Sequence, residues 1–357
     1  MSDAATPPAP SGPPHKRRVR YAGTHPRQFE EKYKELDPSH HASEVDKVMQ
    51  RGQTPAGMHR SICVAKILAI LKPQPGETGL DATLGFGGHT QALIPLVLPG
   101  GRMFGMDIDP IELPRTTARL RALGFADDVL TVHRSNFSEL AALVPLTNGG
   151  FDFILADLGV SSMQIDNPAR GFSFRSDGPL DLRLDPGAGQ SASELLQSVT
   201  RSRLRDLLTD NSDEPFAIPL AAAMQGQYLE TTLQLADLVR ATMEGALKRS
   251  LPQEERVAEI KKTLQRTFQA LRIEVNDEFG ALDKLLAQLP SCLKAGGRVA
   301  ILSFHSGEDR RVKKAFQSGE RDGTYCAVAP DPIRASHEER HSNPRSTSAK
   351  LRWAVRS

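Results

Sequence analysis

The sequence has few of the residues that mark several classes of protein. Only three cysteines occur, Cys63, Cys292 and Cys326, and they lie far apart in the chain. This spacing excludes a disulfide framework and a zinc site built from cysteines, and it is typical of a reducing compartment. No apolar run is long enough to cross a bilayer, and the first residues contain no hydrophobic signal region. We therefore expect a soluble, cytoplasmic protein.

The chain also lacks a strong excess of charge of either sign. It has 45 basic and 43 acidic residues, so its overall field does not indicate a nucleic-acid partner. Basic residues do gather locally, although such a cluster is more often a solvated face than an RNA contact. The four clusters span residues 15–20, 201–205, 261–266 and 310–314.

A strand, a glycine-rich turn, a helix and a second strand are indicated between Leu80 and Asp109. Gly85, Gly87 and Gly88 lack a Cβ, so the backbone can turn sharply there and approach a ligand closely. Asp107 ends the second apolar segment, where a doubly wound sheet presents a carboxylate to ribose hydroxyls. Its separation from Gly85 matches the ~20 residues usual between turn and acid. The pattern predicts a pocket for a nucleoside cofactor.

The third glycine position argues against a dinucleotide. A pyrophosphate-binding turn follows G-x-G-x-x-G, whereas the sixth position here is Thr90, with His89 beside it. S-adenosylmethionine carries a sulfonium group and no phosphate, so its pocket needs the turn and the ribose acid but less of a phosphate cradle. Taken alone, the glycine run also fits an ordinary strand-to-helix turn.

Strand and helix patterns alternate along the chain, which indicates an α/β fold with a parallel sheet. The gap between the fourth and fifth strands is too long for one crossover helix, and residues 191–264 within it are rich in helical signals. We expect a Rossmann-like sheet with an inserted all-helical subdomain. The predicted strands are 79–84, 102–107, 128–133, 151–157 and 298–304, with helices at 90–98 and 110–123.

These patterns divide the chain into four parts. Residues 1–55 form an N-terminal extension of open function, and its first ~20 residues are expected to be disordered because Pro, Ala and Ser cannot bury a core. Residues 56–165 and 266–357 form the two parts of the sheet domain. Residues 166–265 form a helical insertion for substrate recognition.

Polar residues follow the fourth and fifth strands. Asp157 ends the fourth strand, and His305 follows the fifth. Ligands bind at the carboxyl ends of the strands in such sheets, so we expect both groups to face one cleft. The polar residues are Asp157, Ser161, Ser162 and Gln164 in the first group and His305, Ser306, Glu308 and Asp309 in the second.

Seven segments are long enough to be specific to one protein family. They are DATLGFGGHT, MDIDP, DLGVSSMQ, ARGFSFRSDGPLDLRLDP, TFQALRIEVNDE, SFHSGED and NPRSTSAKLR, and they run from about His59 to Arg352. Together they resemble the bacterial 16S ribosomal RNA (cytosine-N4) methyltransferase family, which methylates a cytosine near the ribosomal P site with S-adenosylmethionine. The sequence departs from the family pattern at Met163, Leu182, Leu184, Gly307 and Thr347, and the last replaces an arginine that would contact RNA.

The resemblance implies roles for individual residues at the cofactor. The implied cofactor-binding residues are Gly87, Gly88, His89, Asp107, Phe137, Asp157 and Gln164. The Phe137 ring either stacks on adenine or fills the core. Asp109 precedes Pro110, so a helix-capping role is favoured over ligand contact. No metal is expected, because His337 and His341 lack a third ligand.

The implied reaction places two further demands on the site. The lone pair of the exocyclic cytosine amine is delocalised into the ring, so an acceptor for its hydrogen bonds is needed, and Asp157 or a nearby carbonyl is the candidate. The base must also leave any stack and be held by aromatic or guanidinium planes. Phe172 and Phe174 have an alternative role as anchors of a loop against the insertion. The expected RNA-facing residues are Arg170, Phe172, Phe174, Arg183, His305 and Arg345.

The implied partner is 16S ribosomal RNA within the small ribosomal subunit. The sequence leaves open whether naked RNA is a substrate, and a homodimer is one alternative for the oligomeric state. A rival hypothesis is a non-catalytic ribosome-assembly RNA-binding factor, which would not require the glycine turn, Asp107 and Asp157 together. A DNA amine methyltransferase is disfavoured because residues 157–160 read DLGV and not D-P-P-Y.

Overall fold

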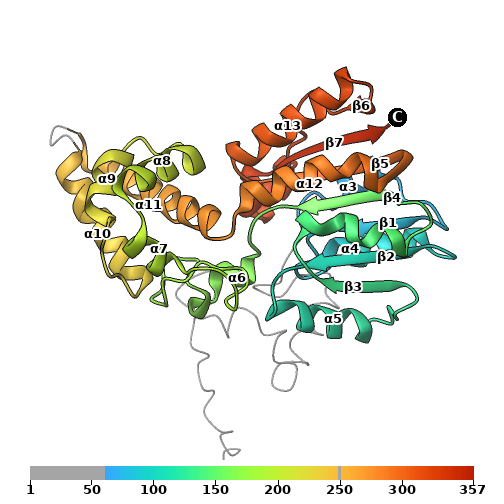
Figure 1. The fold of residues 1–357 in the computed structure, drawn as a ribbon, viewed down its shortest axis with the longest axis horizontal. Coiled ribbons are helices and arrows are strands. Elements are labelled where there is room, and N and C mark those ends of the chain that lie inside the picture. The colour runs from blue at the N-terminus through green and yellow to red at the C-terminus, as the bar shows by residue number, and fades with distance from the viewer. Residues whose placement is uncertain (1–60, 248–250) are drawn as a thin grey trace, which may run out of the picture. The chain divides into compact units, whose positions relative to one another are not determined.

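The computed structural model describes residues 61–247 and 251–357 (Figure 1). All of them belong to one unit of the chain, His59–Ser357. The N-terminal extension predicted over residues 1–55 lies outside the described residues.

A seven-stranded sheet with the order β3-β2-β1-β4-β5-β7-β6 organises the described chain. β1 to β5 pair in parallel, whereas β7 pairs antiparallel with both β5 and β6. All five predicted parallel strands are present with slightly shifted ends, and the last two strands were not predicted. The strands are β1 (Thr78–Asp81), β2 (Arg102–Asp107), β3 (Leu130–Arg134), β4 (Phe151–Asp157), β5 (Leu293–Ser303), β6 (Tyr325–Val328) and β7 (Lys350–Arg356).

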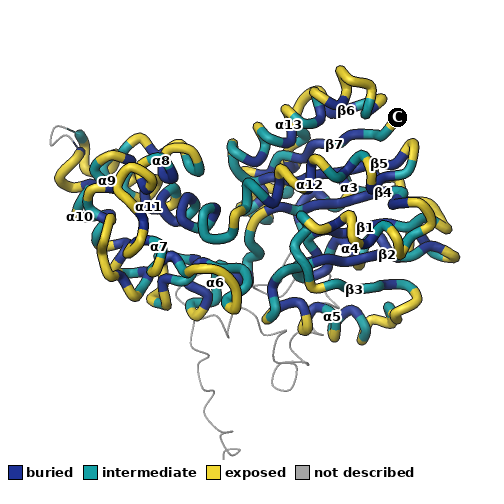
Figure 2. The backbone as a smooth tube through the Cα atoms, in the orientation of Figure 1, coloured by how far each residue is buried: buried dark blue, intermediate teal, exposed yellow. Residues whose placement is uncertain are grey.

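Both faces of the sheet are covered by helices (Figures 1 and 2). In β4, Ile154 and Ala156 pack into the core on one face, and Phe153 and Leu155 pack into the core on the other. Successive strand side chains point to opposite faces, so a strand covered on both sides is apolar throughout. One face is covered by α12 (Glu278–Cys292), α13 (Ser306–Arg321) and η2 (Phe137–Leu146), and the other by α3 (Val64–Leu71), α4 (Gly88–Val97) and α5 (Glu112–Ala122).

The predicted helical insertion follows β4 and has a core of its own, which includes Leu204, Leu235 and Leu271. Its sequence signals are local: the Ser191 hydroxyl accepts the Glu194 N–H and caps a helix. The proposed boundary at 265/266 falls inside α11, and the helical core continues to Val275. The helices are α6 (Ser162–Asp166), α7 (Ala192–Ser198), α8 (Arg201–Ser212), α9 (Ala217–Met224), α10 (Thr232–Ala246) and α11 (Gln253–Val275).

Three short elements complete the described chain: η3 (Pro168–Arg170), α14 (His337–Ser342) and η4 (Pro344–Ser348). Among the described helices, none combines the length and the apolar character needed to cross a bilayer.

Candidate active site

The carboxyl ends of β1, β2, β4 and β5 lie at one edge of the sheet. In the pairing register, Asp81 of β1 lies opposite Leu155 of β4, and Asp157 of β4 lies opposite Leu302 of β5. Asp157 at the end of β4 therefore lies at the same edge as the end of β5, as expected for parallel strands.

The glycine turn after β1 adopts a backbone that disfavours side chains. Gly85 and Gly87 have φ values of 49° and 76°, in the left-handed region. A Cβ on Gly88 would lie 2.1 Å from the Ser61 Oγ. The Gly85 N–H donates to the Asp107 Oδ2 at 2.7 Å, so the carboxylate of β2 fixes the turn of β1.

Asp107 retains hydrogen-bonding capacity. Its Oδ2 accepts the Gly85 N–H and its Oδ1 accepts the Asp109 N–H at 2.9 Å, which leaves a second lone pair on each oxygen. Burial raises the pKa of Asp107 to about 6, although the two backbone N–H groups oppose this shift. At neutral pH the group is thus an ionised acceptor with two free positions, which suits two adjacent ribose hydroxyls.

Asp157 has a buried carboxylate oxygen without a partner. Its backbone N–H donates to the Thr83 Oγ1 at 2.6 Å, but its Oδ1 is buried and accepts no hydrogen bond among the described residues. Burial raises the pKa of Asp157 to about 6; His89 lowers it, and Asp81 and Glu308 raise it. A buried acceptor without a donor costs free energy, which indicates a place where a ligand donor binds.

His89 connects this carboxylate to the start of the described chain. Its Nε2 lies 3.0 Å from the Ile62 carbonyl oxygen, which can only accept, so Nε2 carries a hydrogen. Its Nδ1 then faces the Asp157 Oδ2 at 3.6 Å. The imidazole ring therefore lies directly beside the carboxylate, where His89 lowers the pKa of Asp157.

Two predicted cofactor residues have structural partners. The Gln164 Oε1 accepts the Ser161 N–H, and its Nε2 donates to the Asp109 Oδ2 at 2.6 Å, so the amide ties α6 to the residues after β2. Phe137 begins η2 and packs partly buried against the sheet core. Because the ring is only partly buried, this placement does not separate core filling from stacking on adenine.

A buried ion pair that the sequence did not reveal lies beside Asp107. Asp109 and Arg170, 61 residues apart, contact each other at 2.7 Å and are 1% and 4% exposed. The Asp109 Oδ1 also accepts the N–H groups of Ile111 and Glu112, so the predicted capping is confirmed. Arg170 further donates to the carbonyls that precede α7, including that of Leu184.

The prediction that Arg170 faces RNA is wrong, because the side chain is buried and its guanidinium donates to Asp109 and to the Leu184 carbonyl. Phe172 is 8% exposed and belongs to the core of the insertion, where Phe174 packs edge-on against Phe268 at 5.5 Å. The structure therefore supports the anchoring alternative for both rings. No local pattern signals such contacts, since their partners lie far along the chain.

Two further arginines from the RNA-facing set form ion pairs. Arg183 binds both oxygens of Asp181 at 2.8 and 2.7 Å. Arg345 binds both oxygens of Asp166 at 3.0 and 2.9 Å and is 37% exposed, so it remains accessible at the end of α6.

His305 lies in a compact ionic cluster at the end of β5. It contacts Glu308 at 3.2 Å, and Arg272 binds both oxygens of Glu278 at 2.7 and 3.0 Å. Burial would raise the pKa of Glu308, but His305, the Phe304 amide and Arg272 lower it below its usual value. The side-chain atoms of Glu278, His305 and Glu308 that could bind a metal ion lie within 4.8 Å of one another. Arg272 supplies positive charge to this cluster, because it is paired with Glu278 and lowers the pKa of Glu308.

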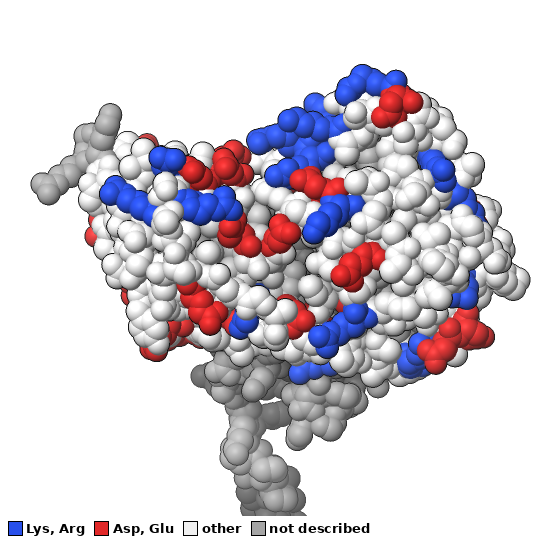
Figure 3. Space-filling view, viewed as in Figure 1, with Lys and Arg blue, Asp and Glu red and all other residues white. Residues whose placement is uncertain are grey.

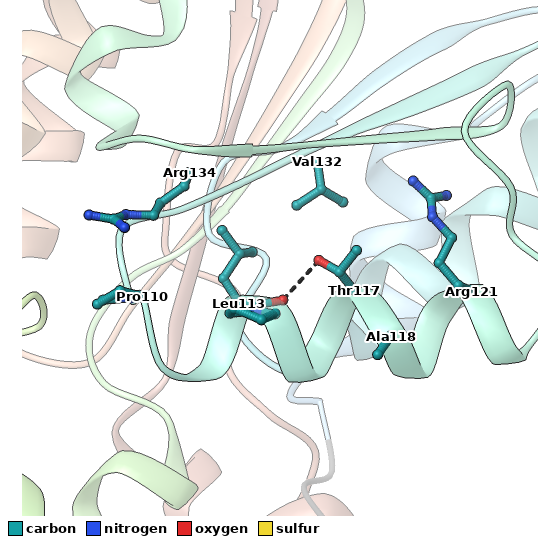
Figure 4. Close-up of a pocket in the computed structure, with 8 residues that line it drawn as sticks. Pro110, Leu113, Thr117, Ala118, Arg121, Val132 and Arg134 are labelled. Carbon is teal, nitrogen blue, oxygen red and sulfur yellow. Dashed lines mark hydrogen bonds between the residues drawn. The ribbon is translucent and has the colours of Figure 1, made fainter.

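A hollow between α5 and β3 lies apart from these residues (Figure 4). Leu113, Thr117, Val132 and Arg134 contribute to its lining, and the Thr117 hydroxyl donates to the Leu113 carbonyl. None of the predicted site residues lines this hollow, so we do not assign the active site to it.

The strand order, the glycine turn after β1 and the acid after β2 define a class, the Rossmann-like S-adenosylmethionine-dependent methyltransferases. A family model described as the MraW methylase family matches residues 56–357. The chain belongs to this family. A methylase of this class takes its methyl group from S-adenosylmethionine, so the predicted cofactor is confirmed.

Curated relatives cover nearly the whole chain. A protein of Alkaliphilus metalliredigens named ribosomal RNA small subunit methyltransferase H 2 is 53% identical over 95% of this chain and 97% of its own length. A protein of Synechococcus sp. named ribosomal RNA small subunit methyltransferase H is 42% identical over 84% of this chain and 92% of its own length.

Solved structures show only a remote likeness. One is a putative rRNA-methylase from Clostridium thermocellum, with a TM-score of 0.38 and 13% identity over 82% of this chain and 95% of that one. Another is a putative methyltransferase from Streptococcus mutans in complex with SAH, with a TM-score of 0.35 and 12% identity over 84% of this chain and 100% of that one. The family assignment depends on neither.

Proposed function

We propose that this protein methylates the exocyclic N4 amine of a cytosine in 16S ribosomal RNA near the ribosomal P site, in the cytoplasm. Relatives at up to 53% identity are named small-subunit ribosomal RNA methyltransferases, which supports ribosomal RNA as the substrate. The observation that carries the choice of an amine is the buried Oδ1 of Asp157, which accepts no hydrogen bond from the part of the chain that the structure describes. An amine is a donor, and this oxygen needs one.

The residues after β1 and β2 fit the methyl donor. Asp107 has one free lone pair on each oxygen for the two ribose hydroxyls, and the turn at Gly85 and Gly87 exposes backbone to the cofactor. When bound, S-adenosylmethionine would supply an electrophilic methyl group from its sulfonium, whose sulfur is left as a neutral thioether once the methyl–sulfur bond breaks. Gln164 and Phe137 support the rim of this pocket through their contacts with Asp109 and the core.

Asp157 orients the nucleophile in this proposal. A hydrogen bond from the amine to its carboxylate favours a pyramidal nitrogen whose lone pair is free to attack. The nitrogen gains a methyl group and loses one proton, and Asp157 accepts that proton because its pKa lies near 6 and it is ionised at neutral pH. The His89 Nδ1 lies 3.6 Å from the Asp157 Oδ2, and His89 lowers the pKa of Asp157, which favours the ionised carboxylate that accepts the proton.

The base is proposed to enter between the ends of β4 and β5. His305 follows β5 and belongs to the cluster that includes Glu308, whose charge acts on Asp157. Residues 56–165 and 266–357 would then hold cofactor and base, and the insertion would recognise the surrounding RNA. Arg345, which stays accessible beside Asp166, is the arginine of the predicted set best placed to contact RNA.

Methyl transfer from labelled S-adenosylmethionine tests the function directly. The protein is incubated with small ribosomal subunits, with naked 16S RNA and with duplex DNA, and the modified nucleoside is mapped by mass spectrometry. We expect N4-methylcytosine in small-subunit RNA. Retained RNA binding without any label would favour the assembly-factor alternative, and label in DNA alone would contradict the RNA substrate.

A further inference from the structure

We infer that the exposed face of α13 binds the phosphate backbone of the RNA substrate. This α13 basic face consists of Arg310, Arg311, Lys313, Lys314 and Arg321. The inference rests on the proposed function, because it assumes that the substrate is RNA. The surface lies outside the residues proposed to bind the cofactor and the reacting base.

The opposite side of α13 fixes the direction of these side chains. Val312 and Phe316 are 1% and 2% exposed and pack into the core on one face of the sheet. Residues three and four positions apart share a face of a helix, so the lysines between these anchors point outward. Figure 3 shows Lys and Arg side chains gathered over α13 at the top of the molecule.

The charge of this face is poorly compensated. Lys313, Lys314 and Arg321 form no ion pair with any residue that the structure describes, and Arg310 reaches Asp213 only at 3.8 Å. Arg311 contacts Asp283 at 3.3 Å and covers the ring of Phe279. Adjacent cations repel one another, and a polyanion removes that cost while it releases counterions.

The basic clusters on other helices differ in this respect. On α11, Lys262 and Arg266 both contact Glu259, and Arg203 of α8 contacts Glu274 at 2.6 Å. These cations are neutralised within the protein, as expected for solvated helix faces. Each of these two clusters keeps one cation without an ion pair among the described residues, Arg201 and Lys261, whereas α13 carries three, Lys313, Lys314 and Arg321.

The shape and position of the face suit an extended backbone. A groove between α12 and α13 is lined by Arg311, Lys314 and Arg321 on one side and by Asp283, Leu286 and Ala287 on the other, and its one acid, Asp283, is paired with Arg311. α13 begins three residues after β5, whose end lies beside Asp157. At ~1.5 Å per residue, cations occur from ~6 to ~23 Å along the helix from its first residue. A backbone bound in this groove would therefore extend away from the base that reacts at the end of β4.

Charge reversal at two exposed positions tests the surface. We compare K313E/K314E with the matched control K72E/R334E, whose side chains are also exposed and lie outside both α13 and the helical insertion. The α13 variant should bind small-subunit RNA ~10- to 100-fold more weakly, and the slope of log affinity against log salt should fall by ~1 to 2. Its KM for RNA should rise, whereas kcat and the affinity for S-adenosylmethionine should not change. The K72E/R334E control should retain wild-type values.

Two outcomes would overturn the inference. One is an unchanged salt slope and KM in K313E/K314E; the other is an equal loss in both variants, which would mean that net charge matters and the location does not. The proposed function fails separately, through a wild-type protein that binds S-adenosylmethionine but methylates no RNA.

Discussion

The sheet edge and the segment between α6 and α7 are both rich in charged residues, but they use these residues in opposite ways. At the edge, the described residues leave one lone pair free on each Asp107 oxygen and provide no partner for the Asp157 Oδ1. In the segment, the Arg170 Nη1 and Nη2 groups donate to Asp109 and to backbone carbonyls, and Arg183 binds both oxygens of Asp181; the buried Arg170 Nε has no partner among the described residues. Carboxylate oxygens that keep free acceptor positions indicate a ligand site, whereas a charged side chain paired with an opposite charge indicates a structural role. The sequence alone does not distinguish the two kinds of charged residue.

The largest expected effect follows from removing the unpartnered acceptor. Asp157→Ala should lower kcat by ~100- to 1000-fold, the range typical for loss of a positioned acceptor or base, with little change in affinity for S-adenosylmethionine. Asp157→Asn keeps a carbonyl oxygen and should retain more activity. Single-turnover methylation of small-subunit RNA measures both, and an Ala variant within a few-fold of wild type would remove Asp157 from the chemistry.

Arg170 should matter for stability and not for RNA affinity. Arg170→Met leaves Asp109 buried without its cation, which should reduce the free energy of unfolding by ~3 kcal/mol in urea titrations. Under conditions where the variant is folded, its salt dependence of RNA binding should equal that of wild type. A reduced salt slope with normal stability would restore the RNA-facing assignment.

Asp157 should also limit stability at high pH. Its pKa is raised to about 6 on folding, so the stability that its protonated form provides is present at low pH and is lost as the pH rises through 6. Asp157→Asn avoids this loss, so its free energy of unfolding at pH 8 should exceed that of wild type by ~1 to 3 kcal/mol. The difference should vanish below pH ~4. An Asn variant that is less stable at pH 8 would contradict the burial argument.

The pH dependence of catalysis gives a smaller, complementary effect. The rate constant should rise with pH up to about 6 and then level off, because only ionised Asp157 accepts the amine hydrogen. His89, Asp81 and Glu308 face or influence this carboxylate, so the observed midpoint belongs to the group together. With saturating RNA, the pH profile of Asp157→Asn should lack the midpoint near pH ~6. A profile unchanged from wild type would assign that midpoint to another group.

The smallest effect is expected at Arg345. Because it is 37% exposed, Arg345→Met should cost no more than ~1 kcal/mol of unfolding free energy despite its two contacts with Asp166. It serves as the matched control for Arg170→Met. A loss as large as that of Arg170→Met would show that exposure does not separate the two arginines.

The features that the sequence predicts correctly are set by neighbouring residues. The five parallel strands follow from apolar runs, the turn at Gly85 and Gly87 follows from backbone geometry, and the Ser191 cap follows from spacing within one helix turn. The placement of Asp107 after β2 is equally local. Such features need no knowledge of the rest of the chain.

The features that escape prediction depend on distant partners. Arg170 meets Asp109 across 61 residues and Arg345 meets Asp166 across 179, so neither pair leaves a periodic or spacing signal. β6 and β7 were missed for a related reason, since β7 gains its place through antiparallel pairing with β5. The extent of α11 past residue 265 is likewise decided by packing of Phe268 and Leu271 in the insertion core.

Calorimetric titration with S-adenosylmethionine tests the central claim, that the turn after β1 and the carboxylate of β2 hold the methyl donor. The account predicts saturable binding to wild type, no uptake of a nicotinamide dinucleotide, and ~100-fold weaker binding by Asp107→Ala, which loses two hydrogen bonds to a charged group. Equal affinity in Asp107→Ala that still folds, or uptake of the dinucleotide in place of S-adenosylmethionine, would contradict it.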